Sequence, residues 1–407
     1  MIVEKIVQNK ARRRKKMFSI PRRQHTSVQT DIIRNKLRGE NGLQLSLSWS
    51  TDMTQENKDI VIRAAQILVD VLINPIIHLV EIGTMTTGLG ESSTPLVGFN
   101  SYSTLRSDYA GTNNFFRESI LDKNLPPSDP LSGTHTYFAA VTQCLSWGLA
   151  ITNAPSQIFI NFSQSGYDLV GVALHELTET MGRIGGFDNA GTTYRGLMDL
   201  CNFDNAGSRA APYGANSYYS FDNGVTFVSH FNTNMDGDAS DWSGQTVARD
   251  CCNAFATKDV IETLSIQDLV VMQGVGFNLA PIEYAAPALQ LIQNREVLLL
   301  NNYSSILEIT TFHITPDLPD ALTSATRTGV IIGAPHNVNT AQAFKVSFVS
   351  DLQNQEGAFS IEIVANTSSN GLSGGEIAGI VIGVAALIVI IVVASVYATK
   401  AKKPKTN

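Results

Sequence analysis

The chain has 407 residues, a formal net charge of −7 and a hydrophobic content of 43%. This length accommodates two soluble domains together with a membrane anchor. Four cysteines are too few for a disulfide framework, and no internal repeat is visible, so the sequence excludes a small disulfide-rich scaffold and a repeat array. Charge is distributed unevenly: residues 1–40 carry +9, residues 399–407 carry +4, and the segment between them carries −20.

Residues 1–40 form a basic arm that contains the run RRRKK at positions 12–16, with Arg22 and Arg23 close behind. Such a run could bind anionic lipid or nucleic acid, or act as a localisation signal. Because no aromatic residues are interleaved with it, we interpret the arm as solvated and disordered and do not expect nucleic acid as a partner. No apolar segment of signal-peptide length follows it, so no cleavable signal peptide is predicted.

The next segment predicts a helix followed by a strand. Apolar residues recur at near-helical spacing over residues 56–73, and Asn74 and Pro75 close the helix. Residues 76–82 alternate as a strand does. We interpret His78 as a residue on one face of that strand rather than as a metal ligand.

Residues 169–181 predict an amphipathic helix that carries chemistry on its polar side. His175 and Glu179 are four residues apart and therefore share one face, with Glu176 beside the histidine. In the HExxH pattern, two histidines at this spacing hold zinc and the glutamate acts as general base. A carboxylate oxygen binds zinc at about 2.0–2.2 Å, so Glu179 can replace the second histidine. The alternative is an ordinary amphipathic helix whose polar face meets water.

The residues around this motif resemble a family of mostly bacterial, secreted zinc metallopeptidases of the zincin type, related to the metzincins. The resemblance covers residues 44–279 and includes HELTETMGR at 175–183. Further similar segments occur in the same order: LVGFNSYSTLR at 96–106, LMDL at 197–200, YSFDNG at 219–224, GDASDW at 237–242 and LSIQDLVVMQGVGF at 264–277. This resemblance implies a zincin-like domain in which a zinc-bound water hydrolyses peptide bonds.

The third zinc ligand departs from the metzincin pattern, because the position three residues after the motif glycine is Gly185, which has no side chain. Asp188 and Asp199 are the candidates by position, and Asp199 is preferred because it lies in the LMDL segment. Met198 could lie beneath the metal as in the metzincins, or could pack in the core. His135, upstream of the motif, and His230, downstream of it, are also candidate ligands, although a solvated or hydrogen-bonded role suits each better.

Residues 190–250 are rich in Gly, Asn, Asp and Ser, which predicts an extended loop region that lines a cleft. Asp236, Asp238 and Asp241 could bind calcium there. Their spacing does not match an EF-hand, so turn formation is the competing interpretation.

The C-terminal part predicts a second domain and an anchor. Short apolar runs separated by polar turns over residues 281–365 indicate a small β-sandwich. A Ser/Gly linker follows at 366–376, then an uncharged run at 377–398 that is long enough to span a bilayer, and a basic tail at 399–407. A buried soluble helix is the alternative for the apolar run. Gly375, Gly379 and Gly383 recur every four residues, which could allow two such helices to approach closely and self-associate.

Three sequons favour a non-cytosolic or envelope-surface location for the main domain, at Asn161, Asn302 and Asn366. Basic residues flank the chain at both ends, so the positive-inside rule does not fix the orientation of one span. Up to two disulfides are possible among the cysteines, and adjacent Cys251 and Cys252 would pair more easily with Cys144 and Cys201 than with each other.

The sequence therefore predicts an α+β fold: a basic arm at 1–40, a zincin-like metallopeptidase domain at 41–280, a β-sandwich at 281–365 and a single-pass C-terminal anchor. The expected activity is zinc-dependent hydrolysis of a protein or peptide substrate, with one zinc per chain. His175, Glu179 and Asp199 are the expected ligands and Glu176 the general base. The alternative is a non-catalytic structural or receptor-binding membrane or envelope protein.

Overall fold

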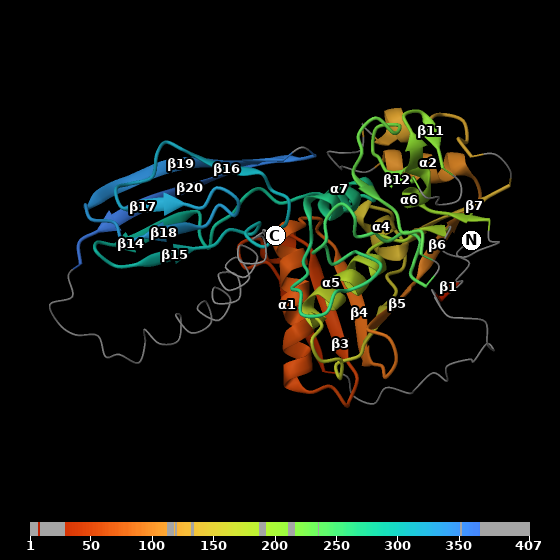
Figure 1. Ribbon diagram of the computed structural model, residues 1–407, viewed down its shortest axis with the longest axis horizontal. Helices are drawn as coiled ribbons and strands as arrows, with labels where there is room; N and C mark the ends of the chain where they lie inside the picture. Colours follow the sequence, from red (N-terminus) through yellow and green to blue (C-terminus); the bar gives the residue numbers. More distant parts are fainter. Residues whose placement is uncertain are drawn as a thin grey trace, which may run out of the picture.

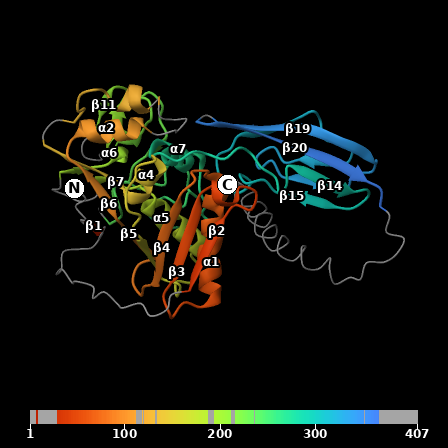
Figure 2. The same ribbon diagram turned by 180° about the vertical axis from the view of Figure 1, so that it is seen from behind.

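The structure is a computed structural model that describes residues 7–8, 29–111, 118, 120–131, 134–186, 193–210, 216–234, 236–350 and 352–366. Figure 1 shows two bodies side by side, one holding the helices and a large sheet and the other built from long strands towards the C-terminal end. The view from behind shows the same division (Figure 2). The motif helix α5 (Leu169–Thr180) lies in the first body.

The largest sheet has six strands in the order β1-β5-β8-β4-β3-β2. Strands β3, β4 and β8 are parallel to one another, and β2 and β5 run antiparallel on either side of them. β1 pairs with the outer edge of β5. The strand bounds are β1 Val7–Gln8, β2 Thr30–Arg34, β3 Gln44–Trp49, β4 Ile77–Thr84, β5 Gly90–Thr94 and β8 Ser156–Ile160.

Two helices cover this sheet, and each begins at a side-chain cap. In α1 (Gln55–Val71), the Thr54 hydroxyl accepts from the Asn57 backbone N–H, and in α5 the Asp168 carboxylate accepts from the Val170 N–H. α1 contacts β2 and β3, α5 contacts β5 and β8, and the two helices contact each other. The apolar residues of both helices are buried, and the carboxylates of α5 also lie at the sheet, where Glu179 accepts a hydrogen bond from Ser92 of β5.

Shorter elements complete the first body. One sheet has the order β6-β7-β9 and another the order β11-β10-β12-β13. Their bounds are β6 Leu96–Phe99, β7 Thr136–Ala140, β9 Tyr194–Arg195, β10 Asn202–Asn205, β11 Ser208–Arg209, β12 Tyr218–Tyr219 and β13 Ser229–His230. The helical pieces are η1 Gly39–Asn41, α2 Tyr102–Ala110, η2 Ile120–Asn124, α4 Val141–Ser146, α6 Leu197–Leu200 and α7 Ile266–Gly274.

The second body contains a four-stranded sheet, β14-β20-β19-β16, and a three-stranded sheet, β15-β18-β17. Phe344, Phe348 and Phe359 are buried within it, and the rings of Phe344 and Phe359 stack at 5.3 Å. The bounds are β14 Ala288–Ile292, β15 Val297–Leu299, β16 Thr311–Thr315, β17 Leu322–Ser324, β18 Ile331–Gly333, β19 Asn339–Val349 and β20 Asn354–Val364.

The predicted α+β fold built on a zincin-like domain is wrong. The described residues form five sheets with few helices, so the described part of the chain is mostly β. The helix predicted at 56–73 is present as Gln55–Val71 and the strand at 76–82 as Ile77–Thr84. The class was missed largely because residues 190–250, predicted to be loop, contain the short strands β9 to β13.

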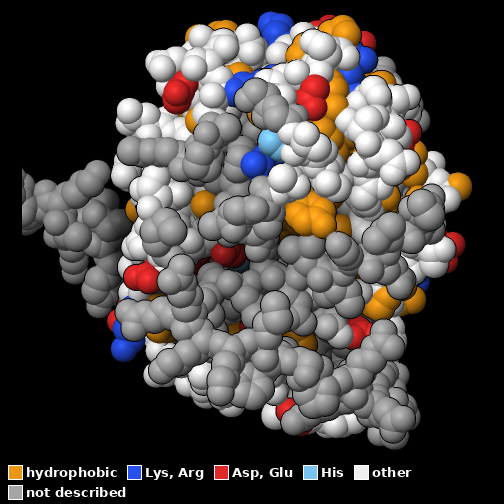
Figure 3. Space-filling view, turned by 90° about the vertical axis from the view of Figure 1, so that its right-hand side faces the viewer, with side chains coloured by type: hydrophobic (Ala, Val, Ile, Leu, Met, Phe, Trp, Pro, Cys, Tyr) orange, Lys and Arg blue, Asp and Glu red, His pale blue; other side chains and the backbone are white. Residues whose placement is uncertain are grey.

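Within the described part of the chain, no helix combines the length and apolarity needed to cross a membrane. The predicted span at 377–398, its glycines Gly375, Gly379 and Gly383, and the tail at 399–407 lie outside the described residues. On the face at the right-hand side of Figure 1, described hydrophobic side chains are scattered and form no single large patch (Figure 3).

Candidate metal centre

Helix α5 and a distant loop bring three ligand-type side chains together. His175 and Glu179 lie one turn apart on α5, and Asp241 comes from the loop that follows β13. The His175 Nε2 atom lies 3.5 Å from Glu179 Oε1 and 3.6 Å from Asp241 Oδ2. One ligand atom from each residue lies within 4.8 Å of the other two. Two carboxylates and one imidazole at this separation can converge on one metal ion.

The orientation of His175 suits a metal ligand. Its Nδ1 atom lies 3.0 Å from the Cys251 carbonyl oxygen, which can only accept a hydrogen bond, so Nδ1 carries a proton. The Nε2 atom then faces the two carboxylates. A backbone carbonyl on the far nitrogen is the usual outer-shell partner of a metal-binding histidine, because it fixes the tautomer and the ring orientation.

The pKa shifts of His175 and Glu179 indicate that the three side chains favour a positive charge between the carboxylates. Burial lowers the pKa of His175, but the carboxylates of Asp241 and Glu179 outweigh burial and raise that pKa well above its usual value. Burial raises the pKa of Glu179, but the hydrogen bond and charge of His175 bring it below its usual value. In the metal-free protein, a proton on His175 therefore balances the carboxylates, and a cation can replace it.

Glu179 presents one oxygen to this group and uses the other for support. Its Oε2 accepts a 2.6 Å hydrogen bond from the Ser92 hydroxyl of β5. Its Oε1 is buried and has one long contact with a donor among the described residues, to His175 Nε2 at 3.5 Å. A buried carboxylate oxygen with so long a contact is costly unless another group satisfies it. This oxygen is the one that faces His175, so the donor set fits a metal ion.

Glu176 lies beside the three ligands and packs against the sheet. It is buried, and a Cβ atom added at Gly90 would lie only 2.2 Å from its Oε1, so the carboxyl rests on the backbone of β5. Burial and the nearby charge of Glu179 raise the pKa of Glu176 well above its usual value. A carboxyl group with a raised pKa next to a metal site is suited to act as general base.

Asp199 does not join the ligands, contrary to the sequence-based assignment. It is fully buried, and its Oδ2 accepts hydrogen bonds from the backbone N–H groups of Gly186 (2.7 Å) and Gly196 (2.6 Å). Asp199 thus holds two chain turns together, and Asp241 completes the group instead. The signal for Asp241 was present in the GDASDW segment, where the sequence suggested only calcium binding or a turn.

Other sequence candidates are placed elsewhere. His78 is buried between Thr142 and Thr180, and Met198 is buried in the core. His135 packs edge-on against Tyr137, and His230 against Phe227. Asp188 lies outside the described residues.

The loop that carries Asp236 and Asp238 is held by Asn232, whose amide donates to the carbonyls of Asn234 and Asp238, both at 3.0 Å. Asp236 and Asp238 belong to neither ligand-type group found among the described residues, so three aspartates do not converge on calcium as the sequence suggested.

The sequons differ in exposure. The Asn161 amide is buried and donates to the Gly88 carbonyl, and the Asn302 amide donates to the carbonyls of Asp70 and Pro281. Attachment of a glycan at either nitrogen would disrupt these hydrogen bonds. Asn366 is exposed.

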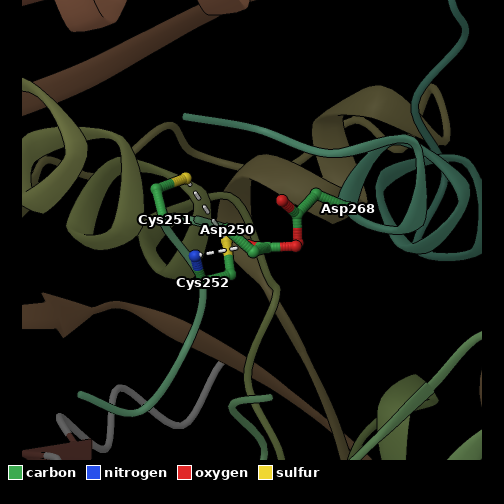
Figure 4. Close-up of side chains that lie close together, drawn as sticks. All are labelled: Asp250, Cys251, Cys252 and Asp268. Atoms are coloured by element: carbon green, nitrogen blue, oxygen red, sulfur yellow. Dashed lines mark hydrogen bonds between the residues drawn. The ribbon is translucent and has the colours of Figure 1, made fainter. Parts of the chain in front are cut away.

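A second ligand-type group consists of Asp250, Cys251, Cys252 and Asp268 (Figure 4). Both carboxylates are already occupied by donors. Asp250 accepts from the Cys252 N–H at 2.7 Å and from the Ser265 hydroxyl at 2.5 Å. Asp268 accepts from the Trp242 ring N–H at 2.8 Å and from the Ser265 N–H at 2.9 Å.

A positive charge is also already present beside this second group, because the Arg183 Nε atom lies 3.8 Å from Asp268 Oδ1. Burial, together with the charge of Asp268, raises the pKa of Asp250 well above its usual value, which favours a protonated carboxyl. All four cysteines of the chain are buried free thiols, and the sulfur atoms of Cys251 and Cys252 are 3.9 Å apart. We therefore interpret the second group as a buried hydrogen-bond network rather than a metal centre.

Comparisons with known proteins assign no family. No protein-family model and no curated protein sequence matches the chain. Among solved structures, a protein from Bacteroides fragilis NCTC 9343 provisionally assigned as an alpha-galactosidase is 14% identical over 20% of this chain, with a TM-score of 0.18. The PKD domain of the KIAA 1837 protein is 12% identical over 23% of this chain and 94% of its own length, also with a TM-score of 0.18.

Extracellular domains 3–5 of Drosophila OTK are 12% identical over 22% of this chain and 33% of their own length, with a TM-score of 0.18. The chain spans only 16% of the length of each of the two Bacteroides fragilis proteins it resembles. Likenesses this weak carry no argument about function, so the function must be argued from the site itself.

Proposed function

We propose that the chain is a zinc-dependent hydrolase that cleaves peptide bonds with a metal-activated water. The observation that carries the proposal is the convergence of His175, Glu179 and Asp241, with the far nitrogen of the histidine held by a backbone carbonyl. The proposal rests on this site and not on the overall fold.

The metal would be held by His175 Nε2, Glu179 Oε1 and Asp241 Oδ2, which are the atoms that face one another. Zinc accepts imidazole and carboxylate ligands, and three protein ligands leave a fourth position open for water. When bound, zinc supplies a Lewis acid that lowers the pKa of its water to about 7.

Glu176 is the residue suited to take the proton of that water. It follows His175 directly, so it lies next to the ligands without being one of them. Its environment raises its pKa, which brings the carboxylate closer in basicity to the proton that it must accept. The His175 side chain keeps 15% of its surface exposed, whereas Glu179 and Asp241 are buried.

We further propose that the enzyme is anchored in a membrane, with its main domain non-cytosolic or on an envelope surface. The support for this location is the uncharged run at 377–398 followed by lysines, and the exposed sequon at Asn366. The substrate class is protein or peptide.

The test measures metal content and hydrolysis in the full-length chain. Elemental analysis should find one zinc per chain in the wild-type protein and in Glu176→Gln, and none in His175→Ala. A peptide-library screen should show cleavage by the wild-type protein alone. A folded wild-type protein without stoichiometric metal would contradict the proposal and favour a non-catalytic structural or receptor-binding role.

A further inference from the structure

Arg183 is a fully buried arginine that connects the two ligand-type groups. Its NH1 donates to Asp241 Oδ1 at 2.9 Å, and its NH2 donates to the Cys252 carbonyl at 3.2 Å. Its Nε lies 3.8 Å from Asp268 Oδ1, and its guanidinium carbon lies 4.7 Å from the centre of the Trp242 ring. The two terminal nitrogens are therefore hydrogen-bonded to the loop region 241–252, while Nε makes only a long ion pair with Asp268 of α7.

These contacts decide which oxygen of Asp241 faces the metal position. Because Oδ1 is bound to Arg183, Oδ2 is the oxygen directed at His175, at 3.6 Å from Nε2. Arg183 is itself held by Asp268, whose Oδ1 also accepts from the Trp242 ring N–H. The orientation of Asp241 thus depends on a rigid planar group that cannot rotate without losing several contacts.

We propose that Arg183 is a positioning residue that holds Asp241 in its metal-binding orientation and so sets the affinity of the site for a divalent cation. The inference rests on the proposed metal site. Residues that support a metal ligand in this way commonly contribute about 10–100-fold to metal affinity. A purely structural ion pair would instead affect the stability of the fold and leave the metal affinity unchanged.

Lysine at this position keeps the charge but cannot contact Asp241, Asp268 and the Cys252 carbonyl at once. Zinc affinity is measured by competition with a chromophoric chelator in the full-length wild-type protein, Arg183→Lys, Asp241→Asn and the double variant. We expect Arg183→Lys to weaken zinc binding by about 10–100-fold. The double variant should bind zinc no more weakly than Asp241→Asn alone, because the arginine acts through that aspartate.

Arg209→Lys is the matched control. Arg209 is a partly buried arginine that lies over the Phe203 ring at 4.8 Å and donates to the carbonyls of Leu200 and Asn124. Like Arg183 it contacts an aromatic ring and backbone carbonyls, but it contacts none of the three proposed ligands. Its replacement should leave zinc affinity unchanged. Circular dichroism of the metal-free proteins verifies folding. If Arg183→Lys does not fold, Asp268→Asn takes its place in the cycle, because it removes the anchor on the other side of the guanidinium.

The outcomes separate the two proposals. If the wild-type protein and Arg183→Lys bind zinc equally well, the role of Arg183 is overturned and the metal site stands. The same conclusion follows if the losses of zinc affinity in Arg183→Lys and Asp241→Asn multiply in the double variant. Wild-type protein that binds no zinc would overturn both proposals.

Discussion

His175 Nδ1 lies 3.0 Å from the carbonyl oxygen of Cys251, a residue 76 positions further along the chain. This hydrogen bond ties α5 to the loop that supplies Asp241 and turns the imidazole so that Nε2 faces the carboxylates. The adjacent carbonyl, that of Cys252, accepts from Arg183, which in turn holds Asp241. Two consecutive carbonyl groups thus orient two of the three ligands, so backbone geometry at positions 251–252 determines the geometry of the site.

Asp241→Asn should lower zinc affinity, whereas Asp199→Asn should lower stability. Asp241→Asn removes the charge of a proposed zinc ligand. Loss of a residue that only supports a ligand typically costs about 10–100-fold in metal affinity, so loss of the ligand charge should cost at least as much. Asp199→Asn weakens the acceptor of two backbone N–H groups, so it should lower the free energy of unfolding by about 1–3 kcal/mol and leave zinc affinity intact. Chelator competition and denaturant unfolding measure the two quantities. Loss of zinc in Asp199→Asn with retention in Asp241→Asn would reassign the third ligand.

Ser92→Ala should weaken zinc binding because it removes the 2.6 Å hydrogen bond to Glu179 Oε2. Without that donor the carboxylate can rotate, and we expect a loss of about tenfold or more in affinity. The neighbouring Ser93 is the control, since successive residues of a strand point to opposite faces. Equal affinities in Ser92→Ala and Ser93→Ala, measured by zinc titration, would show that this contact does not position Glu179.

Gly90→Ala should impair catalysis without removing the metal. The added Cβ would lie 2.2 Å from Glu176 Oε1, so the carboxyl must move. Hydrolysis should fall by about tenfold or more, up to the roughly 10²–10⁴-fold that a general base contributes, while zinc content stays at one per chain. At Gly98, on β6, an added Cβ meets nothing within 4 Å, so Gly98→Ala provides the control. Unchanged turnover in Gly90→Ala would argue against Glu176 as the base.

The local elements could be predicted from the sequence better than the architecture could. Helices α1 and α5 are long and periodic, and the i, i+4 spacing of His175 and Glu179 depends only on the helix. The class was wrong because β9, β11, β12 and β13 are strands of two residues each, which are too short to show alternation. Their pairing is set by tertiary contacts.

The third ligand could not be derived from spacing. Asp241 is 62 residues from Glu179 along the chain and reaches it only because the loop after β13 folds back over α5. Asp199 and Asp241 are both buried aspartates, and their hydrogen-bond and ion-pair partners distinguish them. Backbone N–H groups surround the first, and Arg183 with His175 surround the second.

Stability should decrease in mild acid because of His78. The imidazole is buried, with Nε2 2.8 Å from the Thr180 hydroxyl and Nδ1 2.7 Å from the Thr142 hydroxyl, and burial lowers its pKa from 6.5 to about 3. Between these values the unfolded chain binds a proton that the folded chain does not, so unfolding is favoured as the pH falls below 6.5. At pH 5 the loss from this residue should be about 2 kcal/mol.

His78→Gln removes the titrating group, so the free energy of unfolding of the variant should fall less between pH 7 and pH 5 than that of the wild-type protein. Denaturant unfolding of the metal-free proteins at both pH values measures the difference, and metal-free samples exclude the separate effect of proton competition at His175. His313→Gln, at an exposed position of β16, should keep the wild-type pH dependence. If His78→Gln and the wild-type protein lose stability equally over this range, the pKa of His78 is the same in the folded and unfolded chain, and burial does not lower it.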